Sequence, residues 1–111
     1  MANFNKVILA GNLTREPELR YTPQGSAVLE FGLAVNRSYT DSSGAEREET
    51  CFIECNMWGS RGEGVADYLG KGDPVLVEGR LCFETWETRE GRRSKHEVVV
   101  TDFEFLPGGQ R

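Results

Sequence analysis

The chain has 111 residues, 38% hydrophobic and 28% charged, which is typical of a single soluble domain large enough to fold without disulfides or metal ions. No apolar run approaches the roughly 20 residues that span a membrane, and no cationic segment precedes a long apolar one, so the expected location is the cytoplasm. The net charge of −5 argues against a uniformly basic surface, but residues 41–55 alone hold five acidic groups against one basic group, so a basic groove elsewhere is compatible with it.

The first half of the chain alternates apolar and polar residues with the period of two that predicts β-strands. Residues 4–13 predict a first strand, and a segment rich in turn residues follows, with a short edge strand at 18–21. Residues 28–38 predict a longer strand, and the acidic segment 41–49 predicts a loop. The apolar row of the longer strand consists of Leu29, Phe31, Leu33 and Val35.

The stretch CFIECNMW, residues 51–58, predicts a third long strand with two different faces. Successive side chains of a strand point to opposite faces, so odd and even positions meet different environments. The odd positions form an apolar row suited to the core: Cys51, Ile53, Cys55 and Met57. The even positions combine two large aromatic rings with polar groups: Phe52, Glu54, Asn56 and Trp58.

The second half of the chain changes period once and then returns to alternation. Residues 59–73 predict a short helix, with Val65, Ala66 and Leu69 on its apolar face. Residues 74–86 alternate again, 87–95 form a charged hairpin tip, and 96–105 predict a last strand. In residues 74–86, one face holds Val75, Val77, Leu81 and Phe83.

The order of three main strands, one helix and two further strands predicts an all-β fold. This order fits a five-stranded Greek-key barrel of the oligonucleotide/oligosaccharide-binding type (OB-fold), with its short helix between strands 3 and 4. Closing the barrel also protects apolar strands from pairing at their edges. We expect the domain to cover residues 1–106, with 107–111 beginning a flexible linker.

The cysteines and the polar residues provide no recognisable catalytic or metal-binding motif. Three cysteines without a signal peptide predict reduced thiols. Cys51 and Cys55 lie about 13 Å apart along one strand face, too far for a disulfide or a shared metal. The chain has a single histidine, His96, and the stretch GVADYLGKG lacks the spacing of a phosphate-binding loop. We therefore expect no enzyme activity, no metal and no cofactor.

The placement of aromatic residues is the strongest functional signal. Four rings lie on polar faces or at a strand end, where they can stack on the flat faces of nucleic-acid bases: Tyr39, Phe52, Trp58 and Trp86. Basic side chains interleave with them and could contact phosphates: Lys6, Arg20, Arg37, Arg80, Arg92, Arg93 and Lys95. The alternative for each ring is that it covers a loop or a subunit interface, and for each cation that it is only solvated.

Several stretches, in this order, resemble the DNA-binding domain of bacterial single-stranded DNA-binding proteins. They read NKVILAGNL, EPELRYTPQG, FGLAVNRSY, FIECNMWG and VADYLGKGDPVLVEGRL, followed by Trp86 and a charged hairpin. The resemblance covers residues 3–106 and implies an OB-fold barrel that assembles as a homotetramer and wraps single-stranded DNA. It implies sequence-independent protection of that DNA in replication, recombination and repair, at the nucleoid. It also implies stacking roles for the same four aromatics and phosphate contacts from Lys6, Arg20 and Lys71.

The chain departs from the family pattern at three aromatic positions, where Tyr39, Phe52 and Trp58 stand at places that often hold Trp, Trp and Phe, and at two further places. Ile53 stands where a histidine is common beside the second aromatic position. The family usually continues into a linker and an acidic tip that recruits replication and repair proteins, whereas this chain stops at LPGGQR. We therefore expect such recruitment only if an acidic tip exists beyond this chain.

Two other functions remain as alternatives, and one residue is a test of the DNA-binding hypothesis. Exposed aromatics also anchor protein interfaces, so a protein–protein module, such as an accessory subunit of replication restart, is the second hypothesis, and a nuclease is a distant third. Glu54 lies on the proposed DNA-facing row, where a carboxylate would repel phosphate. We expect it to pair with a nearby arginine or to lie at a subunit contact.

Overall fold

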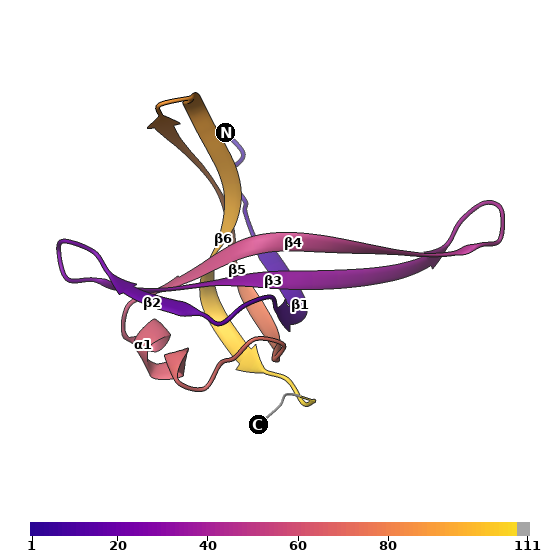
Figure 1. The fold of residues 1–111 in the computed structure, drawn as a ribbon, viewed down its shortest axis with the longest axis horizontal. Coiled ribbons are helices and arrows are strands. Elements are labelled where there is room, and N and C mark those ends of the chain that lie inside the picture. Colours follow the sequence, from indigo (N-terminus) through magenta and orange to yellow (C-terminus); the bar gives the residue numbers. More distant parts are fainter. Residues whose placement is uncertain (109–111) are drawn as a thin grey trace.

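In the computed structural model, which describes residues 1–108, the strands and one short helix form a barrel with two long arms (Figure 1). In chain order the elements are β1 (Val7–Leu13), β2 (Glu18–Tyr21), β3 (Ala27–Thr40), β4 (Glu46–Trp58), α1 (Ser60–Ala66), β5 (Pro74–Thr88) and β6 (Gly91–Phe105). The last barrel strand ends at Phe105, close to the predicted domain end, and the predicted linker lies largely outside the described residues.

The strands pair in the order β1-β5-β6-β4-β3-β2, and β1 pairs again with β3 at Asn12↔Ala34 and Leu13↔Leu33. This second pairing closes a barrel of five strands and leaves the short β2 on the outside of β3. The β4–β6 pair is parallel and the other pairs are antiparallel over the described residues. The predicted five-stranded OB-fold barrel, with α1 between its third and fourth strands, is therefore confirmed.

The core fills the inside of the barrel with apolar side chains from every barrel strand. β3 contributes the predicted row, of which Leu29, Phe31 and Leu33 are fully buried. The other strands and the segment after α1 add Leu13, Cys55, Met57, Leu69, Val75, Val77, Val98 and Val100. Alternation along each strand is what allows one face to be buried while the other meets solvent.

Two strand pairs continue far beyond the barrel as arms (Figure 1). The β3–β4 arm extends to Thr40↔Glu46, and the β5–β6 arm to Thr88↔Gly91. The prediction of a loop over residues 41–49 is wrong, because only residues 41–45 lie outside the strands. Glu49, one of the acidic residues of this segment, pairs across the ladder with Arg37 at 2.6 Å.

The arms also explain why some side chains on the predicted core faces are exposed. Cys51 is exposed, and Leu81 and Phe83 expose 42% and 59% of their surface. Their strands keep the predicted alternation, but beyond the end of the barrel no opposite wall covers the inner face.

The helix is shorter than the sequence pattern predicts. α1 ends at Ala66, and Leu69 is buried in the segment that follows the helix.

Candidate nucleic-acid interface

Trp58 and Trp86 line one surface depression of about 400 Å³ together with Arg20 and Lys95. We call this depression the tryptophan groove. Parallel pairing of β4 with β6 places the end of β4 beside β6, and β6 in turn pairs with β5, which holds Trp86. Four of the residues predicted to bind DNA, distant in the sequence, are thus brought together.

The strand register places Trp58 at the groove, and one hydrogen bond restrains its ring. Trp58 lies opposite Val28, and Val28 lies opposite Arg20, so these three residues follow one another across β4, β3 and β2. Directly opposed side chains of a sheet point to the same face. The indole Nε1 donates to Asn56 Oδ1 at 3.0 Å, which restrains the ring while half of it stays exposed.

Trp86 lies on the β5–β6 arm with cations on the neighbouring strand. It is opposite Arg93, and Glu84 is opposite Lys95. The Lys95 Nζ atom lies 6.0 Å from the centre of the Trp86 ring, at the outer range of a cation–π contact. An exposed ring beside an ammonium group is an arrangement that can hold a base and its phosphate at once.

Carboxylates of the same groove balance these cations. Glu30 accepts hydrogen bonds from Arg20 Nε at 3.0 Å and Nη2 at 2.7 Å, and this contact lowers the pKa of Glu30. Lys95 lies 3.7 Å from Glu97, which is only 7% exposed. Burial raises the pKa of Glu97, and the neighbouring carboxyl of Glu84 raises it further. The groove is therefore a mixed polar surface rather than a purely cationic one.

Phe52 lies apart from the tryptophan groove, in a smaller depression of about 140 Å³ that His96 also lines. Its ring is 71% exposed. Glu54, on the same row, accepts two hydrogen bonds from Arg15, at 2.9 and 2.8 Å, so the expected arginine partner is confirmed. Gly32 makes room for this pair, because a Cβ there would lie 2.7 Å from Arg15 Nη1.

Tyr39 lies near the tip of the β3–β4 arm, which points away from the barrel (Figure 1). The Arg37 guanidinium lies 4.8 Å from the centre of its ring, and Arg37 also pairs with Glu49. Tyr39 therefore lines neither depression described above. The structure divides the four predicted stacking residues into one pair at the groove and two separate positions, and their role in binding stays a prediction.

The remaining predicted phosphate contacts are scattered. Six of the eight basic residues pair with carboxylates; besides Arg20, Arg37 and Lys95 these are Lys6 with Glu78 at 3.4 Å, Arg92 with Glu87 at 3.0 Å and Arg93 with Glu90 at 4.0 Å. Arg92 and Arg93 point to opposite faces of the arm because they are successive strand residues. Arg80 Nη1 donates to Cys82 Sγ at 3.0 Å, and Lys71 is exposed.

The sequence pattern did not indicate the part that polar residues play in lining the tryptophan groove. Asn56 is 6% exposed and accepts the Trp58 hydrogen bond, although the alternation placed it on the same row as Trp58. Alternation places Glu84 on the Trp86 face, but nothing in the sequence pattern brings Glu97 next to it. Their proximity depends on the antiparallel register of β5 and β6, in which Glu97 lies opposite Cys82, and no local pattern indicates that register.

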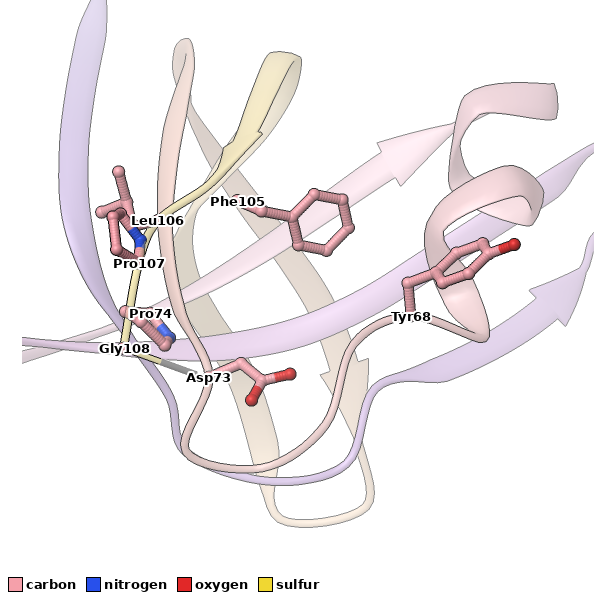
Figure 2. A pocket seen from close by; sticks show the side chains of 7 residues that line it. All are labelled: Tyr68, Asp73, Pro74, Phe105, Leu106, Pro107 and Gly108. Atoms are coloured by element: carbon pink, nitrogen blue, oxygen red, sulfur yellow. The ribbon is translucent and has the colours of Figure 1, made fainter. Parts of the chain in front are cut away.

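A separate and mainly apolar cavity of about 370 Å³ lies between the segment after α1 and the end of β6 (Figure 2). The Phe105 ring points toward Tyr68 across it. None of its lining residues, among those the structure describes, is one predicted to bind DNA. Over residues 1–108 no cluster of His, Cys, Asp or Glu is arranged to hold a metal ion, and no helix there is long and apolar enough to cross a membrane.

Comparison with relatives of known sequence places this geometry in a family. Residues 4–106 match the model of the single-strand binding protein family. The chain is 45% identical over 104 residues to the single-stranded DNA-binding protein of Wolinella succinogenes, covering 93% of this chain and 64% of that protein. It is 51% identical to single-stranded DNA-binding protein A of Bacillus subtilis, covering 93% and 59% respectively. The chain thus spans about three-fifths of the length of these relatives.

Solved structures agree with the sequence comparison. A deletion variant of the single-stranded DNA binding protein from Thermus aquaticus matches with a TM-score of 0.85 and 38% identity, over 95% of this chain and 51% of that one. The Plasmodium falciparum SSB complex with ssDNA matches with a TM-score of 0.87 and 25% identity, over 96% and 97%. The barrel, its aromatic surface and these matches agree that the chain belongs to the single-strand binding protein family.

Proposed function

We propose that this chain binds single-stranded DNA without reading its sequence, and that it does so without catalysis. Bases stack on Trp58 and Trp86, and Arg20 and Lys95 neutralise the adjacent phosphates. The observation that supports this most is the convergence of these four residues in the tryptophan groove. The similar fold of the Plasmodium falciparum SSB, which was solved in complex with ssDNA, supports the same ligand class.

Stacking suits a sequence-independent binder because every base has a flat face. An aromatic ring contributes roughly 1–3 kcal/mol per stacked base. The Arg20–Glu30 ion pair, at 2.7 Å, is partly exposed, and pairs of this kind contribute only about 0–1 kcal/mol. A phosphate can therefore replace the carboxylate partner at small cost.

Fluorescence titration with an oligo-dT tests this proposal. We expect quenching of tryptophan emission and an affinity that falls with salt, with a log-log slope of roughly 0.7 per phosphate neutralised. Trp58→Ala and Trp86→Ala should each weaken binding by about 1–3 kcal/mol. Both rings are about half exposed, so the fold should be retained.

Tyr68→Ala is the matched control, since Tyr68 is an exposed aromatic residue that lines the separate apolar cavity. It should bind DNA like the unmodified chain. Absence of quenching and of retention on a single-stranded DNA column at low salt would contradict the proposal and favour the protein–protein module. Unfolding of either tryptophan variant would show that its ring belongs to the core.

We further propose that the chain assembles as a homotetramer and acts in DNA replication, recombination and repair, at the nucleoid in the cytoplasm. Family membership supports both parts. Leu81 and Phe83 support assembly, because they are exposed apolar residues on one face of the β5–β6 arm. The Phe83 ring packs at 4.9 Å against His96 and extends this face. Recruitment of replication and repair proteins is proposed only for a chain that carries an acidic tip.

A further inference from the structure

Trp58 also lines a second depression, of about 450 Å³, beside the tryptophan groove. Its other walls are Tyr21 at the end of β2, the turn at Gly25 and Ser26, and Glu63 of α1. The two depressions share Trp58, so they form a continuous surface that passes around the end of β4. Tyr21 was not among the aromatic residues that the sequence pattern singled out.

The geometry around Tyr21 presents its ring to this second depression. Tyr21 follows Arg20 directly, and successive strand side chains point to opposite faces. Arg20 therefore lines the tryptophan groove while Tyr21 lines the depression beyond Trp58. The Tyr21 hydroxyl donates to Glu63 Oε2 at 2.7 Å, and this bond anchors the ring while 56% of the residue stays exposed.

We propose that the single strand continues past Trp58 and that Tyr21 stacks a further base, extending the DNA path beyond the tryptophan groove. The proposal rests on the proposed DNA-binding function. The wall beside Tyr21 is built of small residues, and the hydroxyls of Ser26 and Ser60 can donate hydrogen bonds to a phosphate. The one carboxylate of this wall, Glu63, already accepts the tyrosine hydrogen bond.

The test compares oligo-dT probes of graded length, roughly 4 to 16 nucleotides, the range occupied by one barrel of this type. Tyr21→Ala should bind the shortest probe that quenches Trp58 and Trp86 as tightly as the unmodified chain does. Longer probes reach the second depression, and there the variant should be weaker by about five-fold or more. Tyr21→Phe keeps the ring and should retain most of the affinity for all lengths.

Two further variants separate stacking from folding. Tyr21→Leu keeps an apolar side chain against α1 but has no flat ring, so it should lose affinity for long probes as Tyr21→Ala does. Tyr68→Ala, which follows α1 and lines the separate apolar cavity, should bind every probe normally. Circular dichroism confirms that each variant is folded before binding is compared.

The outcomes distinguish the inference from the function on which it rests. If the unmodified chain binds DNA and Tyr21→Ala or Tyr21→Leu binds long probes equally well, the extended path is wrong. An equal loss on the shortest and longest probes overturns it too, because Tyr21 would then act through Trp58. If the unmodified chain binds no probe at low salt, the proposed DNA-binding function itself fails.

Discussion

Individual side chains in the tryptophan groove show how an acidic chain can still bind a polyanion. Arg20 and Lys95 do not face solvent alone, because Glu30 and Glu97 hold them in position. The negative charge thus lies next to the cations instead of being confined to a remote loop. Outside the groove, the Glu54 carboxylate is likewise paired with a cation, the Arg15 guanidinium, at 2.8 Å. DNA binding at such a surface should be an exchange of ion pairs, and strongly dependent on salt.

Glu97→Gln tests the electrostatic part of this picture. The folded state raises the pKa of Glu97, first by burial and then through the Glu84 carboxyl, while Lys95 and Asn56 oppose the shift. The protonated form is therefore favoured on folding, and the stability that it contributes is lost as the pH rises through the folded-state pKa. Glutamine cannot ionise, so its free energy of unfolding lacks this decrease. The variant should therefore become more stable relative to the unmodified chain as the pH rises.

Urea unfolding of both chains at pH 5 and at pH 8 measures this difference. The advantage of Glu97→Gln should be larger at pH 8, and its affinity for oligo-dT should be higher there because one carboxylate is gone from the groove. Glu87→Gln, which removes an exposed carboxylate from the β5–β6 arm, is the control for the loss of one negative charge. An advantage that is the same at both pH values would contradict the expected protonation of Glu97.

At the level of secondary-structure elements, the two arms are the main departure from a plain barrel. Each arm continues the alternation of its strands, but only the part inside the barrel is buried on one face. A bulge between Glu78 and Gly79 interrupts the β5–β6 ladder within the barrel, at the end of the β1–β5 pairing, where Val7 lies opposite Gly79. Bulges bend strands locally, and this one changes the register of β5 and β6 on the way to the arm that places Trp86 and Lys95 at the groove.

Gly79→Ala should disturb this bend. A Cβ at Gly79 would collide with the carbonyl oxygen of Val99 on the paired strand, so the backbone must shift. We expect a loss of about 1–3 kcal/mol in the free energy of unfolding, measured with urea. DNA affinity should fall as well, since the arm positions Trp86.

Gly64→Ala is the matched control for this glycine. Gly64 lies in α1, and a Cβ there meets no atom within 4 Å. The change should be neutral or stabilise the chain by about 0.4–1 kcal/mol, through the entropy of the unfolded state. If Gly79→Ala is as harmless as Gly64→Ala, the close approach at the bulge is not a constraint on the fold.

For the whole molecule, the exposed apolar face of the β5–β6 arm predicts assembly. Phe83→Asp places a charge on that face, which would be costly to bury. Light scattering of the unmodified chain should give the mass of four chains, and the variant should give a smaller mass. Tyr68→Asp changes an equally exposed aromatic residue elsewhere and should leave the mass unchanged. A single-chain mass for the unmodified protein would contradict the proposed tetramer.

Much of this molecule follows from local pattern. Alternation with a period of two identified the core row Leu29, Phe31 and Leu33, and the change of period near residue 60 located α1. The same alternation separated Phe52 and Trp58 from the core, and both are exposed. It failed for Cys51 and Phe83, because alternation assigns a side chain to a face of a strand and says nothing about whether another layer covers that face.

The amino-acid sequence alone determined the barrel class, the order of its elements and the kinds of side chain available for stacking and phosphate contact. Only the tertiary structure decided which of them meet. Trp58 and Trp86 share a groove because β4 pairs in parallel with β6 and β6 pairs with β5, whereas Tyr39 is carried away on an arm. Strand pairing depends on registers between distant segments, and these are set by barrel closure and core packing rather than by neighbouring residues.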